Sequence, residues 1–338
     1  MVPLILPESL PTSFRAALSA AKQILKQSPR LTIEGRVDTE AEQLLVAVYR
    51  LTTGVSLSRM ELFNKMQGPV AVQVDAPVAF SKAAAEQLFE LAQQRVYGVP
   101  LQYLIGVQWF GDHEYEVGPA VLIPRPETEV LLDTVFRELS VAQIAPELGI
   151  EVGLGSGVLS IELLSHFPKL KMIASELMEA ACQVAIRNSK KILGLGTANG
   201  ERLTLVRPAN AHEGIEVFRQ TFEFSADFIL SNPPYLIKKV EVQSAGNGEY
   251  KTEVDQDVFL HEPHEALFAP KDEPLYFYNN IMEHGRRYLK PRGFVFMEVP
   301  HERAQFILER FRVNGWFAKI LPDLTGRDRV LVARLIPL

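Results

Sequence analysis

The sequence predicts an α/β protein in which a domain with a mostly parallel sheet follows a smaller, all-helical domain. From residue 12 to residue 96 the apolar side chains recur with the period of a helix. From residue 150 onward, short apolar runs alternate with amphipathic ones, which is typical of parallel strands joined by crossover helices. A length of 338 residues exceeds the usual size of one domain. We therefore expect a helical domain at 1–97, a linker with a β-hairpin at 98–126 and the α/β domain at 127–338.

Helix start and stop signals define the elements of the first domain. Thr12 or Ser13 is expected to cap a helix that runs to residue 27, and Thr39 with Glu42 has the spacing of a capping box. A further helix is expected from Ser81, with a glycine at position 98 to end it. No strand pattern interrupts this region, so it predicts a bundle of helices.

The elements of the second domain follow in order. Residues 106–110 and 114–117 read as two strands around a Gly-Asp turn, and Glu127 opens a helix after two prolines. Apolar runs then predict strands at 150–152, 171–174, 203–206, 228–230 and 294–298, helices at 158–166, 178–190, 276–289 and 302–311, and two closing strands at 317–321 and 329–335. The segments 194–200 and 238–257 are expected to be loops.

Composition limits the possible partners and compartments. The net charge of -6 argues against a long phosphate backbone as the main partner, so we expect no direct nucleic-acid binding. The single cysteine, Cys182, allows no internal disulfide and fits a reducing compartment. No apolar segment reaches transmembrane length and the first residues lack a signal-peptide pattern, so we expect a cytoplasmic protein without membrane contact.

A glycine-rich turn follows the first strand of the second domain and opens a helix. It reads Glu151-Val152-Gly153-Leu154-Gly155-Ser156-Gly157. Glycines there let the backbone approach a ligand, and the helix start presents free N–H groups. The third glycine comes one residue too early for a dinucleotide fingerprint, whereas an acid before G-x-G-x-G suits S-adenosylmethionine, whose ammonium a carboxylate can meet. Glu176, about twenty residues later at the next strand end, is placed to take both ribose hydroxyls.

The most informative segment for the chemistry is Ser231-Asn232-Pro233-Pro234-Tyr235, directly after an apolar strand. A planar NH2 group that attacks a methyl group needs an acceptor for each hydrogen. The side-chain carbonyl of Asn232 and the main-chain carbonyl of Pro233 can supply them, because Pro234 holds its predecessor extended. The ring of Tyr235 could stack on the substrate's flat face. A proline-rich turn that merely ends the strand is the alternative reading.

Three further groups of residues have more than one interpretation. Residues 261–265 read His-Glu-Pro-His-Glu, but they lack the H-E-x-x-H spacing of a zinc site, so we expect a loop near the active site. Trp109 and Phe110 are interpreted as core residues. Arg125, between two prolines, is expected to brace the loop that binds substrate, and a simple surface charge is the alternative.

The chain resembles the HemK-type protein-(glutamine-N5) methyltransferases, which modify peptide chain release factors. The motifs that carry this resemblance are Pro100-Leu101-Gln102-Tyr103-Leu104-Ile105-Gly106, Ile123-Pro124-Arg125-Pro126-Glu127-Thr128-Glu129, the glycine turn, Asn232 to Tyr235, Glu262-Pro263 with Ala266-Leu267, and Gly326-Arg327-Asp328-Arg329-Val330. The run from Ile123 to Glu129 is far more specific than the glycines. It is also more similar to the release-factor enzymes than to relatives that act on a ribosomal protein.

The resemblance implies a Rossmann-like, seven-stranded class I methyltransferase domain behind a helical substrate-recognition domain at 1–97. Such an enzyme uses S-adenosylmethionine to methylate the glutamine of a Gly-Gly-Gln motif, in support of translation termination. It implies that residues 153–157 wrap the methionine moiety, that Glu176 holds the ribose, and that Asn210 lies beside the adenine. Asn232, Pro233, Pro234 and Tyr235 would hold the glutamine amide, with Asn232 also against the cofactor. The partner would be a release factor, and we expect the enzyme to be a monomer.

The sequence departs from the family at several cofactor positions. The family usually has Asp where Glu151 and Glu176 stand, a small residue at Leu154 and an acid at Ala209. Two other functions stay open at this point, one allowed by the segment from Asn232 to Tyr235 and one suggested by Leu154 and Ala209. One is methylation of an exocyclic base amine of DNA or RNA, which presents a similar NH2 group. The other is a degenerate cofactor fold kept as a binding module.

Overall fold

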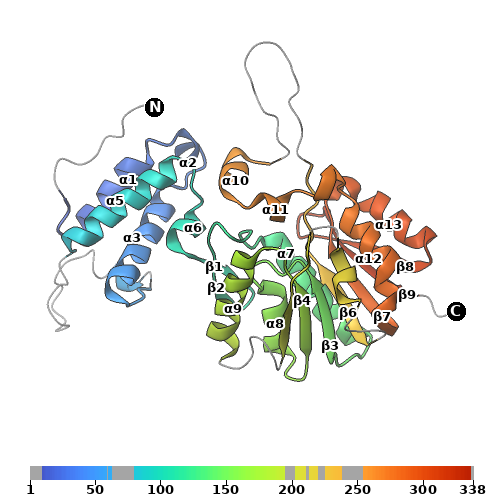
Figure 1. Ribbon diagram of the computed structural model, residues 1–338. Coiled ribbons are helices and arrows are strands. Elements are labelled where there is room, and N and C mark those ends of the chain that lie inside the picture. Colours follow the sequence, from blue (N-terminus) through green and yellow to red (C-terminus); the bar gives the residue numbers. More distant parts are fainter. Residues whose placement is uncertain are drawn as a thin grey trace, which may run out of the picture. The chain divides into compact units, whose positions relative to one another are not determined.

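The structure, a computed structural model, describes residues 10–58, 60–62, 80–194, 202–210, 213–219, 225–237 and 254–335. The chain forms two compact units, Met1–Gly106 and Val107–Leu338 (Figure 1). The expected linker divides between them, because residues 98–106 belong to the first unit and residues 107–126 to the second. The expected loops at 194–200 and 238–257 lie largely outside the described residues. None of the described helices has both the length and the apolar character that crossing a membrane requires.

Every described element of the first unit is a helix: α1 (Phe14–Leu25), α2 (Pro29–Ile33), α3 (Val37–Thr53), α5 (Lys82–Val96) and α6 (Leu101–Ile105). Ser13 caps α1 as expected, since its hydroxyl accepts from the Ala16 N–H, and Ser81 caps α5 in the same way. The expected capping box at Thr39 is wrong. Gly35, at a φ of +67°, ends the preceding turn, and α3 therefore begins two residues before Thr39.

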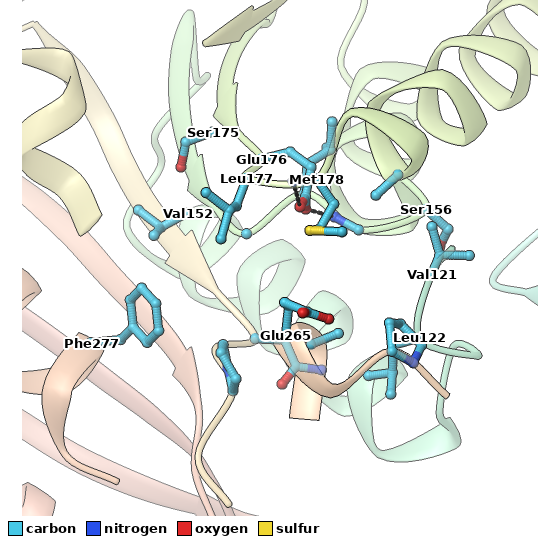
Figure 2. A pocket seen from close by; sticks show the side chains of 18 of the residues that line it. Val121, Leu122, Val152, Ser156, Ser175, Glu176, Leu177, Met178, Glu265 and Phe277 are labelled. Carbon is cyan, nitrogen blue, oxygen red and sulfur yellow. Dashed lines mark hydrogen bonds between the residues drawn. The ribbon is translucent and has the colours of Figure 1, made fainter. Parts of the chain in front are cut away.

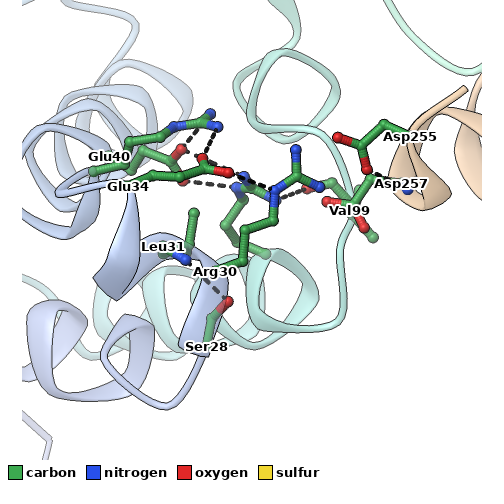
Figure 3. Close-up of polar contacts among 10 residues, drawn as sticks. Ser28, Arg30, Leu31, Glu34, Glu40, Val99, Asp255 and Asp257 are labelled. Carbon is green, nitrogen blue, oxygen red and sulfur yellow. Dashed lines mark hydrogen bonds and ion pairs between the residues drawn. The ribbon is translucent and has the colours of Figure 1, made fainter.

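A buried ion pair joins two helices of the first unit (Figure 3). Glu40 on α3 and Arg95 on α5 are 2% and 4% exposed, and their closest atoms, Oε2 and Nε, are 2.6 Å apart. Arg36 adds a second guanidinium at 2.6 Å from Glu40 Oε1. Glu40 is thus shared by two guanidinium groups, and its pair with Arg95 connects α3 to α5.

A seven-stranded sheet forms the centre of the second unit (Figure 1). Its strands are β3 (Leu148–Val152), β4 (Lys171–Ser175), β5 (Leu203–Val206), β6 (Ala226–Ser231), β7 (Leu289–Glu298), β8 (Trp316–Pro322) and β9 (Asp328–Leu335), in the order β5-β4-β3-β6-β7-β9-β8. The first five strands are parallel, while β9 pairs antiparallel with β7 and β8. The predicted Rossmann-like fold is confirmed, and its strand order reverses between β3 and β6, where such sheets bind ligands.

Helices cover both faces of this sheet. The apolar residues of α7 (Pro126–Val141), α8 (Val158–His166) and α9 (Glu179–Leu193) pack with Phe228 and Leu230 of β6 in one cluster. Those of α12 (Tyr276–His284) and α13 (Ala304–Val313) pack with Ile229 on the other face. Successive strand residues point to opposite faces, so a strand buried on both sides reads as one continuous apolar run. Short helical turns complete the unit: α10 (Gln256–His261), α11 (His264–Leu267), η1 (Gly214–Phe218), η2 (Pro270–Asp272), η3 (Gly285–Arg287) and η4 (His301–Arg303).

A β-hairpin precedes α7, as the sequence predicts, and consists of β1 (Val107–Phe110) and β2 (His113–Glu116). Phe110 is buried, but Trp109 is 63% exposed, so its assignment to the core is wrong. The two residues are neighbours on one strand and point to opposite sides of the hairpin. Cys182 is buried on α9.

Candidate active site

The glycine turn lies between β3 and α8, and its three glycines have two different roles. All three adopt left-handed backbone angles, with φ of +82° at Gly153, +57° at Gly155 and +88° at Gly157. A Cβ atom on Gly153 or Gly155 would meet no protein atom within 4 Å, whereas one on Gly157 would lie 2.9 Å from Ile161 Cδ1. The first two glycines therefore leave space for a ligand, and the third allows close packing around the start of α8.

The turn opens onto a cavity of about 470 Å³ at the carboxyl ends of β3, β4 and β6 (Figure 2). This volume lies in the range of small-molecule sites. Ten of the residues that the sequence assigns to the site line it: Arg125, Glu151, Gly153, Leu154, Gly155, Ser156, Glu176, Asn210, Asn232 and Pro234. The other three, Gly157, Pro233 and Tyr235, are not among the lining residues. The structure thus brings five separate segments of the chain to one site.

Glu176 stands at the end of β4 with its carboxylate held by main-chain donors. Its Oε2 atom accepts from the Gly155 N–H at 2.8 Å, and Oε1 accepts from the Met178 N–H at 2.9 Å (Figure 2). Burial raises the pKa of Glu176, and these hydrogen bonds oppose that rise. Each oxygen keeps a second lone pair, so the carboxylate has a fixed orientation and can still accept from hydroxyl groups of a ligand.

Glu151, the acid before the glycines, lies in the wall of the same cavity but is only 1% exposed. The hydroxyl of Ser160 on α8 donates to its Oε2 atom. Burial raises the pKa of Glu151 to about 8, because little water remains to solvate the charged form. A cation bound beside this carboxylate would lower that pKa and be held by the resulting charge.

Asn232 follows β6 and is held through its side chain. Its Nδ2 atom donates to Thr128 Oγ1 at 2.9 Å, and that hydroxyl donates to Glu298 Oε2 at 2.7 Å. With its amino end held by Thr128, the carboxamide has its carbonyl Oδ1 as the end that can accept from a substrate N–H. The hydroxyl of neighbouring Ser231 donates to the Val152 carbonyl at 2.6 Å, which ties the end of β6 to β3.

The remaining residues of the Asn-Pro-Pro-Tyr segment differ in their surroundings. Pro233 is buried, and Pro234 lines the cavity. Tyr235 is partly buried and packs against the apolar cluster on the α12 face of the sheet. That burial raises the pKa of Tyr235 well above its ordinary value, so the phenol is neutral. Stacking of its ring on a substrate stays a prediction.

Arg125 connects two segments that surround the cavity. Its guanidinium lies 2.5 Å from Glu262 Oε1, and Glu262 Oε2 accepts from the Ile123 N–H at 3.1 Å. Glu262 therefore ties residues 123–125 to the loop that the sequence places near the site. Pro263, between α10 and α11, and His264 and Glu265 of α11 line the cavity. The expected loop at 261–265 is wrong in extent, because only residues 262 and 263 lie outside these two short helices.

Several residues at the site have no role there assigned from the sequence, although Thr128 belongs to the motif at 123–129. Leu177, Met178 and Phe277 line the cavity, and Thr128 and Glu298 hold Asn232. The rule that ligands bind outside strand ends could have found Leu177, because it directly follows Glu176. Thr128 and Glu298 are 170 residues apart, so only the fold shows that they meet.

The site residues fit S-adenosylmethionine. Gly153 and Gly155 form a cradle that side chains would fill, and the buried Glu151 offers a carboxylate to an ammonium. Glu176, at the end of the neighbouring strand, offers oriented acceptors to ribose hydroxyls. A seven-stranded sheet with this strand order and this turn at its switch point defines a class I methyltransferase.

Comparisons with known proteins identify the kind of methyltransferase. The chain is 32% identical over 235 residues to the release factor glutamine methyltransferase of Bacteroides thetaiotaomicron, covering 69% of this chain and 75% of the relative. It is 33% identical over 246 residues to that of Koribacter versatilis, covering 72% and 78%, and 29% identical over 288 residues to that of Aquifex aeolicus, covering 85% and 91%. No family model matches the chain. The chain belongs to the family of release factor glutamine methyltransferases.

Proposed function

We propose that this protein transfers a methyl group from S-adenosylmethionine to the side-chain amide nitrogen, N5, of the glutamine in the Gly-Gly-Gln motif of a peptide chain release factor. The observation that carries the proposal is the position of Asn232, whose carboxamide is held at the wall of the same cavity as the glycine turn. An acceptor for a planar NH2 group and a cradle for the methyl donor thus share one cavity. Family membership supports this acceptor and this donor.

The residues of the chain act by orienting the acceptor nitrogen. One N–H of the glutamine amide donates to Asn232 Oδ1 and the other to the Pro233 carbonyl, which keeps the NH2 plane fixed and directs its open face to the donor. The cofactor supplies a methyl group on a sulfonium. The nitrogen held by Asn232 and Pro233 would take this methyl group in exchange for one proton, which would pass to water, and the sulfur would keep the electron pair of the broken carbon–sulfur bond. Catalysis then comes mainly from alignment by preorganised acceptors.

The donor side is assigned in the same proposal. Residues 153–157 hold the methionine moiety, with Glu151 opposite its ammonium, Glu176 at the ribose and Asn210 beside the adenine. All of these except Gly157 line the cavity. The departures from the family at Glu151 and Glu176 keep the negative charge and lengthen its reach by one methylene group.

The proposal also covers the oligomeric state, the compartment and the class of the acceptor. We infer that the enzyme acts as a monomer in the cytoplasm and that its acceptor is a protein. The excess of acidic over basic residues supports a protein acceptor, since a strand of nucleic acid would need a basic groove.

One labelling experiment tests the proposed reaction. The protein is incubated with S-adenosylmethionine labelled in the methyl group, a release factor and a structured RNA. Label is expected in the release factor, and it should be absent from a release factor whose motif glutamine is replaced by alanine. Label in the RNA would favour the base-amine methyltransferase instead. Absence of S-adenosylmethionine binding in calorimetry would favour the degenerate module.

A further inference from the structure

Asn232 is linked to a buried acid by a chain of two hydrogen bonds. Thr128 lies in the first turn of α7, and Glu298 is the last residue of β7. Both residues are 3% exposed. The hydroxyl of Thr128 lies within hydrogen-bond distance of Glu298 Oε2 on one side and of Asn232 Nδ2 on the other. Glu298 is not among the residues that line the cavity, so the acid acts on the site through Thr128.

The single hydrogen of the Thr128 hydroxyl determines which group donates in each of these two hydrogen bonds. Thr128 has one hydroxyl hydrogen, and an ionised Glu298 can only accept, so the hydrogen points to Glu298. The lone pairs on Thr128 Oγ1 then face Asn232 and require a donor. Of the two ends of the carboxamide, only the Nδ2 end can donate, and Oδ1 is therefore directed away from Thr128.

We propose that Thr128 and Glu298 are positioning residues that select which end of the Asn232 carboxamide meets the substrate. This inference rests on the proposed function, because a glutamine NH2 group needs an acceptor and would find a donor if the carboxamide were reversed. The negative charge of Glu298 also polarises these two hydrogen bonds, and this makes Asn232 Oδ1 a stronger acceptor.

Protonation of Glu298 would reverse the selection. A neutral carboxyl group can donate its hydrogen to Thr128 Oγ1, and Thr128 then needs an acceptor for its own hydrogen. A flipped Asn232 supplies that acceptor with Oδ1 and turns its NH2 end toward the substrate. The orientation of Asn232, and with it the activity, should depend on the charge of Glu298.

The surroundings of Glu298 place this change near neutral pH. Burial raises the pKa of Glu298 to about 7, and the hydrogen bond from Thr128 opposes this rise. Arg329 on β9 and Arg125 before α7 favour the charged form, whereas Glu127 on α7 opposes it. Two phenols also face the acid, Tyr278 on α12 and Tyr235 after β6, and burial raises the pKa of both, so they stay neutral. Above about pH 7 the carboxylate is ionised and Oδ1 faces the substrate; below it, this selection is lost.

A nuclear magnetic resonance experiment tests the inference without any acceptor. The side-chain NH2 signals of Asn232 are assigned in the full-length protein by comparison with Asn232→Ala. We expect these signals to titrate with a midpoint near 7 in the wild type and in Thr128→Ser, which keeps the hydroxyl. The titration should disappear in Glu298→Gln and persist in Glu162→Gln, a buried acid on α8 that contacts Tyr115 and His113. An Asn232 signal that is insensitive to pH, or that titrates equally in Glu298→Gln, overturns the inference.

Kinetics test the same inference at the level of catalysis. Thr128→Val should lower kcat about 10- to 100-fold with an unchanged Kd for S-adenosylmethionine, because only alignment is lost. Thr128→Ser should restore kcat, and Thr134→Val, the same change at a buried threonine elsewhere on α7, should leave it unaltered. The wild type should lose activity as pH falls through 7, and Glu298→Gln should not show this loss. Equal kcat in Thr128→Val and the wild type overturns the inference, whereas a wild type inactive on release factors overturns the proposed function and leaves the resonance test decisive.

Discussion

The two halves of the active site are built in different ways. On the donor side, the carboxylate of Glu176 is held by N–H groups of residues 155 and 178, and Glu151 is held by Ser160, nine residues along the chain. On the acceptor side, Asn232 depends on Thr128 and Glu298, and Arg125 depends on Glu262 at a separation of 137 residues. Local turns therefore form the cofactor cradle, whereas tertiary packing orients the acceptor. Substitutions should separate the two halves, with donor-side changes altering cofactor affinity and acceptor-side changes altering transfer.

The largest effect is expected at Asn232. Asn232→Ala removes the acceptor that aligns the glutamine NH2 group and should lower kcat/KM for the release factor by about a thousandfold. Binding of S-adenosylmethionine should stay measurable by calorimetry, because the glycine cradle is intact. Transfer at the wild-type rate by this variant would remove Asn232 from its assigned role.

A smaller effect, confined to cofactor affinity, is expected at Gly155. Gly155 lines the cavity, and an added Cβ would meet no protein atom within 4 Å. Gly155→Ala therefore places a methyl group in the space left for the ligand and should weaken S-adenosylmethionine binding roughly tenfold, or about 1.4 kcal/mol. Gly326→Ala is the matched control, since Gly326 has a φ of +84°, an equally open Cβ position and a place in the β8–β9 loop. Calorimetry should show wild-type affinity in the control. Equal affinity in both variants would contradict the assignment of the cradle.

A pH-dependent effect of several-fold is expected at Glu151. Because the pKa of Glu151 is about 8 in the free enzyme, most of its charge is missing at lower pH. The ammonium of the cofactor favours the ionised form, so affinity should rise as pH increases toward 8 and fall as pH decreases. Calorimetry on Glu151→Gln should give a flatter profile below pH 8. A parallel slope in the two proteins would show that Glu151 does not meet the ammonium.

The smallest effect is expected from the brace at Arg125. Arg125→Met breaks a partly exposed ion pair with Glu262 and should lower kcat/KM for the release factor about fivefold, which corresponds to roughly 1 kcal/mol. The affinity for S-adenosylmethionine should not change. Arg137→Met, which removes an exposed arginine on α7, serves as the control. Weaker cofactor binding in Arg125→Met would contradict the assignment of Arg125 to the acceptor side and assign it to the donor side.

The same contrast explains how much of the molecule the sequence could predict. The seven-stranded sheet and the glycine turn were predictable, because strands buried on both faces give continuous apolar runs and the turn is a contiguous motif. The acid Glu176 follows from its place at the next strand end. Each of these features depends on residues that are near in sequence or share one edge of the sheet.

The predictions that failed depended on local patterns that tertiary structure overrides. Thr39 has the spacing of a capping box, but α3 begins earlier because Gly35 ends the preceding turn. Trp109 is a large apolar residue that the hairpin turns outward. Thr128 and Glu298 went unrecognised at the site because nothing in either segment indicates the other. The orientation of the acceptor group is thus the part of the site that requires the fold.

Peptide mapping of a methylated release factor tests the central claim most directly. The release factor is incubated with S-adenosylmethionine and either the wild-type protein or Asn232→Ala, digested, and sequenced by mass spectrometry. One methyl group on the side-chain amide of the Gly-Gly-Gln glutamine is expected with the wild type, and an unmodified peptide with Asn232→Ala. A methyl group on any other residue, or equal modification by the two proteins, would contradict the account.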